Sequence, residues 1–277
     1  MHRSEITIDL GAVRRNVRRL RSLLDRTELW AVVKADGYGH GAADVAGAAL
    51  GEGARALCVA TVAEALELRP EFPGVRILVM GPTNGREVAR AREADLDLAV
   101  WDEVIPEGVR VHLKLDTGMG RWGLSELPAP TAEVVGLMSH LATADSDKDF
   151  ARTQVERFEQ ASAAYPHLIR HIANSAAALR LPESHLDAAR CGVAIYGLSP
   201  FGEPPATDGL EPALRWDSHL AQVRRLAQGV IISSDTGQPA SLNDLCIERG
   251  TTMAYNAEAT EAARKDVVEF LSNLLKK

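Results

Sequence analysis

The stretch that decides the fold is Glu28 to Gly41, ELWAVVKADGYGHG. Its apolar run, Leu29 to Val33, is typical of a strand buried on both faces of a parallel sheet. Lys34 closes the run, where burial disfavours the charged ammonium and leaves a neutral amine able to form a Schiff base. The alternative is a strand-end lysine whose ammonium reaches solvent along its aliphatic stem. The residues alone leave both interpretations open.

The pattern around this stretch predicts a TIM-like (β/α)8 barrel of the α/β class. Three glycines after Lys34 allow a tight turn into a helix, and Tyr38 places a hydroxyl near the lysine. Strand-like runs are expected at 29–33, 56–61, 75–80, 96–101, 109–115, 134–142, 168–173 and 186–190. Helices are expected at 10–24, 42–50, 62–69, 86–94, 149–164 and 175–181. Alternating strands and helices imply a parallel sheet, and eight strands imply a closed barrel.

Two connections of this barrel are too short for a packed helix. Only DEVIPEG separates the fourth and fifth barrel strands, and LSELPAPTAE precedes the sixth. We therefore expect a somewhat trimmed barrel. A further short strand, Glu5 to Asp9, precedes the first helix.

Composition narrows the class of protein. The 277 residues carry a net charge of −7, which argues against a nucleic-acid or anionic-membrane partner. Three scattered cysteines indicate neither a metal site nor a disulfide framework. No apolar signal core opens the chain, and no eighteen apolar residues run together. A cytoplasmic enzyme or binding protein is expected.

The motif AVVKADGYGHG closely resembles the cofactor-lysine motif of alanine racemases. That family uses a TIM-like barrel, and its lysine holds pyridoxal 5'-phosphate (PLP) as a Schiff base. The resemblance implies that Lys34 is the catalytic, cofactor-bearing lysine. It also implies that the Tyr38 hydroxyl binds the cofactor phosphate.

A second block, VHLKLDTGMGRWG at 111–123, also resembles the family. The match implies that Arg121 reaches the phenolic oxygen of PLP. It further implies that Lys114 is the lysine carbamylated in many racemases, where the added negative charge positions the arginine. Without the resemblance, a strand-end lysine and a surface arginine would be the plainer interpretation.

Three later blocks complete the resemblance. SHLATAD places His140 along the cofactor ring, and HIANSA assigns Asn174 and Ser175 to the cofactor, with Ser175 on the phosphate at a helix N-terminus. RCGVAIYG assigns the backbone amides of Gly192 and Val193 to the phosphate, and Arg190 to the pyridine nitrogen. Each block also has a structural interpretation, such as an ordinary helix cap or a buried strand. The agreement of five blocks in order favours the cofactor site.

The resemblance ends near residue 228. We expect a PLP-binding barrel over 1–228 and an unrelated, partly helical tail over 229–277. The family's second base is a tyrosine from its second domain, and no block like the one that carries it is present. Tyr255 lacks that context. The first strand is expected to lack its usual partner in that domain, which makes the family's homodimer doubtful.

The sequence thus predicts an isomerase, an alanine racemase by ancestry that supplies D-alanine for cell-wall precursors. Its substrate is expected to be alanine or another small amino acid, and its activity is expected to be impaired for want of the second base. The alternative is a non-catalytic PLP-binding barrel that serves PLP homeostasis. A weaker alternative is a cofactor-free Schiff-base aldolase.

Overall fold

The computed structural model describes residues 4–102 and 104–218. The chain divides into two compact units, one of residues 7–215 and one of residues 1–6 with 216–277. The expected tail at 229–277, Tyr255 and the domain boundary at 228 lie outside the described residues. They stay predictions.

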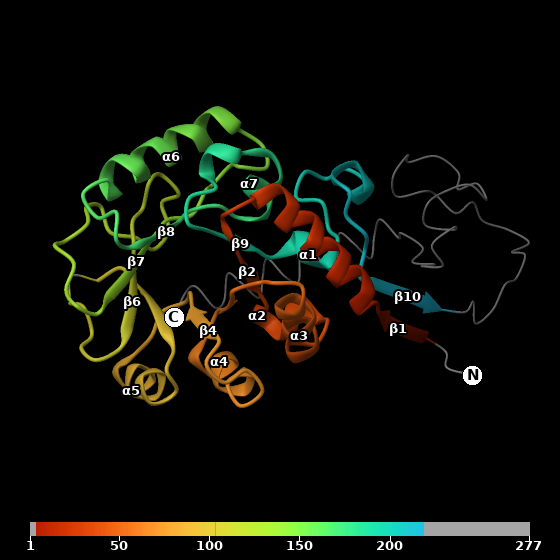
Figure 1. Cartoon of the computed structure of the whole chain (residues 1–277), viewed down its shortest axis with the longest axis horizontal. Helices are drawn as coiled ribbons and strands as arrows, with labels where there is room; N and C mark the ends of the chain where they lie inside the picture. The colour runs from red at the N-terminus through yellow and green to blue at the C-terminus, as the bar shows by residue number, and fades with distance from the viewer. Residues whose placement is uncertain (1–3, 103, 219–277) are drawn as a thin grey trace, which may run out of the picture. The chain divides into compact units, whose positions relative to one another are not determined.

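The larger unit is an eight-stranded, nearly closed parallel barrel, as predicted (Figure 1). Neighbouring strands follow the order β8-β7-β6-β5-β4-β3-β2-β9. The strands are β2 (Glu28–Val32), β3 (Ala56–Val59), β4 (Arg76–Val79), β5 (Asp97–Val100), β6 (Arg110–Lys114), β7 (Val134–Met138), β8 (Ile169–His171) and β9 (Ala188–Cys191). Between β8 and β9, the Asp187 N–H donates to the Arg170 carbonyl at 2.9 Å, and the Arg190 N–H donates to the Ala173 carbonyl at 3.0 Å. These bonds bring the two ends of the sheet together.

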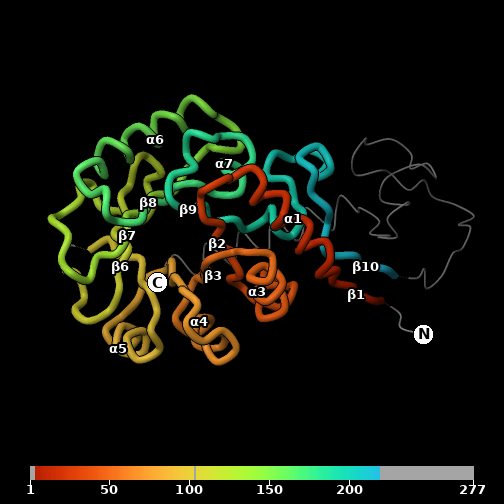
Figure 2. The backbone as a smooth tube through the Cα atoms, in the orientation of Figure 1, coloured from red at the N-terminus to blue at the C-terminus, as the bar shows by residue number. Residues whose placement is uncertain are grey.

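The helices lie outside the strands (Figure 2). They are α1 (Leu10–Leu24), α2 (Lys34–Gly39), α3 (Ala42–Gly51), α4 (Val62–Leu68), α5 (Gly85–Glu93), α6 (Lys148–Ser162) and α7 (Ser175–Arg180), with short 3₁₀ turns at Pro182–Ser184, Val193–Tyr196 and Pro205–Asp208. Side chains of Asp9, Asn84, Asp147 and Asn174 cap the N-termini of α1, α5, α6 and α7. Of the described residues that connect β5 to β6 and β6 to β7, none is helical. The prediction of a trimmed barrel is confirmed.

The alternation of side chains along β2 separates two apolar clusters. Leu29, Ala31 and Val33 pack between the strands and the helices. Trp30 and Val32 belong to a smaller cluster of strand residues from six strands, which fills the barrel interior. Lys34 continues the inward-facing series and therefore stands at the C-terminal mouth of the barrel.

A two-stranded sheet joins β1 (Ser4–Ile8) to β10 (Leu214–Ser218). The first strand therefore has a partner from residues just after the barrel. The expectation that it lacks its usual partner from a second domain stays a prediction. Among the residues that the structure describes, no helix has the length and apolar character needed to cross a membrane.

Candidate active site

Most of the residues singled out from the sequence line one cavity at the C-terminal mouth of the barrel. Its volume is about 320 Å³. Eight of those residues contribute to its wall: Lys34, Tyr38, His140, Asn174, Ser175, Arg190, Gly192 and Val193. They come from the ends of β2, β7, β8 and β9, so the parallel barrel gathers segments that lie far apart in the sequence.

The segment after Lys34 is a left-handed turn rather than an ordinary helix. Ala35, Asp36 and Tyr38 have φ angles of 52°, 51° and 54°, a region that is unfavourable for residues with a Cβ. Gly37, with φ 60°, adopts it without that cost. The turn therefore needs hydrogen bonds from its surroundings to persist.

Glu64 supplies such bonds from the start of α4. Its carboxylate accepts the Ala35 N–H at 2.8 Å and also the N–H groups of Ala60 and Thr61, at 2.7 and 3.1 Å. It therefore joins the turn after β2 to the loop after β3, beside the residue that follows Lys34. On the other side of the turn, His40 Nδ1 lies 3.1 Å from the Gly37 and Tyr38 carbonyls.

The cavity has the chemistry expected of a phosphate site. Ser175 Oγ accepts the N–H groups of Gly192 and Ala194, at 2.9 and 3.3 Å, so the start of α7 is tied to the turn after β9. A Cβ on Gly192 would lie 2.6 Å from the Tyr38 hydroxyl, so only glycine lets that hydroxyl approach the backbone. Burial raises the pKa of Tyr38, which therefore stays a hydroxyl donor at neutral pH. Asn174 lines the cavity while its side chain caps α7.

Arg190 is almost fully buried, and the barrel uses all but one of its donors. Its Nη1 donates to His171 Nδ1 and to the His171 carbonyl at 2.9 Å, and its Nη2 donates to the carbonyls of Ser139 and Ile172 at 2.6 and 3.3 Å. No acceptor among the described residues lies against its Nε–H, and Arg190 lines the cavity. The geometry fits a ring nitrogen that accepts a hydrogen bond, as an unprotonated pyridine does. The residues present therefore fit PLP.

Lys114 and Arg121 line a neighbouring cavity of about 520 Å³, which shares Lys34, His140 and Arg190 with the first. Burial, with the positive charges of Arg121 and Arg190, lowers the pKa of Lys114 to about 8. The Lys114 amine also lies over two stacked indoles, 5.4 Å from the Trp101 ring and 5.7 Å from the Trp122 ring. Arg121 and Lys114 are thus brought together, one cavity away from Tyr38 and Ser175.

His140 stands between the two cavities. Burial lowers its pKa to about 3, helped by the charges of Arg190 and Arg121 and, more weakly, of Lys114 and Lys34. The imidazole is therefore neutral throughout the physiological range. A neutral ring is suited to pack along an aromatic cofactor among so many cations.

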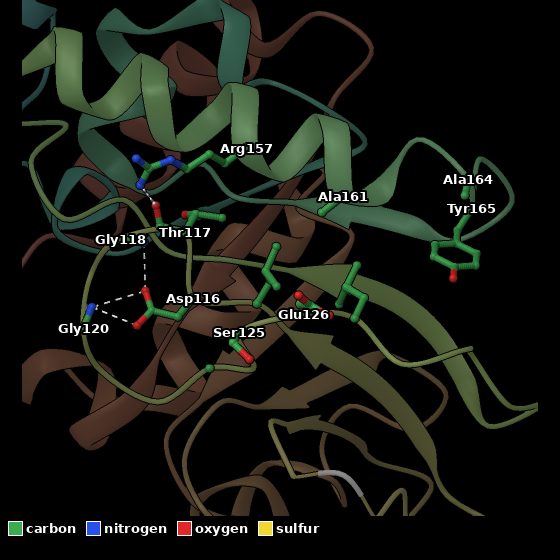
Figure 3. Close-up of a pocket in the computed structure, with 13 residues that line it drawn as sticks. Asp116, Thr117, Gly118, Gly120, Ser125, Glu126, Arg157, Ala161, Ala164 and Tyr165 are labelled. Carbon is green, nitrogen blue, oxygen red and sulfur yellow. Dashed lines mark hydrogen bonds between the residues drawn. The ribbon is translucent and has the colours of Figure 1, made fainter.

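A third, larger cavity of about 810 Å³ is lined by residues of the loop after β6 and of α6 (Figure 3). There the Asp116 carboxylate accepts N–H groups of Gly118, Met119 and Gly120, and Arg157 of α6 donates to the Thr117 carbonyl. The cavity lies between α6 and the helix-free connection from β6 to β7. These bonds fix the loop that carries Arg121.

Sequence reasoning missed several residues that shape the site. Glu64 and Trp122 gave no motif signal of their own, since one reads as a helix-cap residue and the other as a surface aromatic. Asp97 and His112 did give a signal, because each is a polar residue inside a predicted buried strand. Both belong to a line of buried hydrogen bonds that ends at Arg190.

Residues 8–200 match the family described as alanine racemase, N-terminal domain. The alanine racemase of Beutenbergia cavernae is 43% identical over 257 residues, covering 82% of this chain and 68% of its own length. The crystal structure of alanine racemase from Streptomyces lavendulae is 39% identical, with a TM-score of 0.71 over 78% of this chain and 65% of that chain. The Bacillus anthracis alanine racemase, solved with bound L-Ala-P, is 29% identical with a TM-score of 0.69, over 85% and 69%. The chain thus spans about two thirds of the length of these relatives.

Proposed function

The chain belongs to the alanine racemase N-terminal domain family, and from this premise we propose that it is a PLP-dependent barrel acting on alanine or another small amino acid. The observation that carries the proposal is the convergence of Lys34, Tyr38, Ser175, Arg190 and His140 on one cavity.

The cofactor would be held by side chains at its two ends. The Lys34 amine is the covalent attachment point. The hydroxyls of Tyr38 and Ser175 donate to the phosphate, and the Nε–H of Arg190 donates to the pyridine nitrogen. When bound, PLP supplies an electron-withdrawing ring that acidifies the α-hydrogen of an attached amino acid.

The chain's own groups then hold or move protons. Lys34, released as a free amine, takes the α-proton from the face on which it stands. Arg190 keeps the pyridine nitrogen unprotonated, because two positive charges in contact are unfavourable. A weaker electron sink favours simple proton exchange over side reactions. Arg121 neutralises the phenolic oxygen, and a carbamate on Lys114 would hold that arginine in place.

Inversion needs a second acid on the opposite face of the α-carbon. In the resembling family a tyrosine of the second domain has this role, and this sequence holds no matching block. A positioned general acid contributes about 10²–10⁴-fold to a rate. We therefore propose that this chain removes the α-proton faster than it inverts the substrate.

Covalent labelling tests the attachment point. The protein with added PLP should show a visible absorbance band, and borohydride should fix the cofactor on the peptide that contains Lys34. Lys34→Ala should abolish the labelling while Lys148→Ala, an exposed lysine of α6, should leave it unchanged. Labelling of Lys114 in the unaltered protein would contradict the assignment.

The missing second-base block favours one further candidate, a PLP-binding barrel without catalysis. It predicts the same labelling of Lys34 but no exchange of the substrate α-hydrogen. A cofactor-free aldolase predicts neither an absorbance band nor affinity for the phosphate.

A further inference from the structure

Beneath the candidate site, four buried side chains form a line of hydrogen bonds through the barrel interior. Arg190 of β9 contacts His171 of β8, whose Nε2 lies 2.8 Å from His112 Nδ1 on β6. His112 Nε2 in turn lies 3.2 Å from Asp97 Oδ2 on β5. Asp97, His112 and His171 have no exposed surface, and Arg190 is 3% exposed. We refer to this line as the Arg190–Asp97 chain.

The Arg190–Asp97 chain can run in only one direction. A guanidinium only donates, so His171 Nδ1 must accept and its proton must sit on Nε2. His112 Nδ1 must then accept from His171, and its own Nε2–H donates to the Asp97 carboxylate. Burial lowers the pKa of both histidines, so each is a neutral ring with one donor and one acceptor. Each group donates to the next, and the line ends at an acceptor with no proton to give.

A glycine on the strand between the two histidines leaves space for their contact. They lie on β6 and β8, with β7 between them. At the crossing point β7 carries Gly136, where an added Cβ would overlap His112 Nδ1 and come within 2.6 Å of its Cε1. Trp30 of β2 closes the other side, with its ring centroid 4.7 Å from that of His171 and 5.6 Å from that of His112. The histidine pair is therefore a packed feature of the interior.

At the end of the Arg190–Asp97 chain away from the cavity, two arginines bind Asp97. Asp97 Oδ2 accepts from Arg76 at 3.0 Å, and Oδ1 accepts from Arg110 at 2.6 Å. Burial alone raises the pKa of Asp97, but the hydrogen bond from the neutral His112 ring and the charges of Arg110 and Arg76 outweigh it and lower the pKa. Asp97 is thus an ionised carboxylate that accepts from three donors at once.

We propose that Asp97 and His112 are positioning residues for the cofactor, acting through His171 to fix Arg190 with its Nε–H toward the cavity. Because Asp97 can only accept, it sets the proton positions on both rings. His171 Nδ1 is then always an acceptor for Arg190. With the Nη donors satisfied inside the barrel, Nε–H is the donor left for a ring nitrogen. The consequence for the cofactor rests on the proposed function, whereas the proton positions do not.

Replacing Asp97 by asparagine removes this directionality at almost constant volume. An amide can present its NH₂ group to His112, which then accepts on Nε2 and carries its proton on Nδ1. His171 would then carry its proton on Nδ1, where it opposes the Arg190 donor. The guanidinium would lose its fixed orientation although no residue of the cavity wall has changed.

The test is the histidine tautomer in the full chain without added PLP, read from ¹H–¹⁵N spectra of the imidazoles. We expect both His112 and His171 to carry the proton on Nε2 alone, and Asp97→Asn to give mixed or Nδ1-protonated states at His171. The control is Asp95→Asn. Asp95 is an exposed partner of Arg110, which also binds Asp97, but Asp95 is not a member of the Arg190–Asp97 chain. This variant should leave both tautomers unchanged.

A second measurement follows the cofactor. PLP should bind Asp97→Asn on the order of tenfold more weakly than the unaltered chain, the lower end of the effect seen when a group that orients a ligand-binding residue is lost. Asp95→Asn should bind as the unaltered chain does. An Nδ1 proton on His171 in the unaltered chain would overturn the inference even if Asp97→Asn fails to fold. So would an unchanged tautomer in folded Asp97→Asn. Neither result bears on whether the barrel binds PLP.

Discussion

The surroundings of Lys114 lower the pKa of its side-chain amine. Lys114 is 5% exposed and stands beside Arg121, and both conditions disfavour its ammonium form. A pKa of about 8, below the usual lysine value, makes about half of the amine neutral at that pH. The neutral amine is the form that attacks carbon dioxide, forming an N–C bond and releasing a proton to solvent.

We predict a carbamate on Lys114 whose amount rises as pH increases through about 8. Nuclear magnetic resonance with ¹³C-bicarbonate should show the signal in the unaltered chain and lose it in Lys114→Ala. Arg121→Gln removes a neighbouring positive charge, so the pKa of Lys114 should rise and the pH dependence should shift upward. A signal that persists in Lys114→Ala would assign the carbamate elsewhere.

At the scale of elements, the left-handed turn after β2 begins at Lys34, the proposed catalytic lysine, and Glu64 of α4 accepts a hydrogen bond from this turn. Glu64→Gln keeps the size of the side chain but turns one carboxylate oxygen into a donor that faces backbone N–H groups. We expect the free energy of unfolding to fall by about 1.5 kcal/mol, the lower end for a hydrogen bond to a charged group. Glu67→Gln, an exposed position of the same helix, should change it little. Equal stability of the two variants in denaturant unfolding would remove Glu64 from this role.

The sequence predicts elements better than the links between them. All eight barrel strands form where apolar runs predicted them, because burial on both faces leaves a local pattern. The same reasoning expected only a tight turn after Lys34. The left-handed turn is hydrogen-bonded to Glu64, which lies thirty residues further along the sequence than Lys34 and meets the turn only in the folded barrel. The pairing of β1 with β10 was missed for the same reason.

At the scale of the whole molecule, the barrel brings the five sequence blocks to one mouth and leaves one side trimmed. The resemblance predicted which residues line the mouth, since those motifs carry their own recognisable order. It could not predict the Arg190–Asp97 chain, because its members are single polar residues on four strands. Only barrel closure places them in contact.

The central claim is that this barrel, carrying PLP on Lys34, removes the α-proton of a small amino acid. It is tested most directly by following α-deuterium incorporation and inversion of L-alanine together in heavy water. We predict measurable incorporation in the PLP-loaded chain, inversion slower than incorporation, and neither in Lys34→Ala. Absence of incorporation in a chain shown to hold PLP on Lys34 would contradict the claim and indicate a non-catalytic PLP-binding barrel.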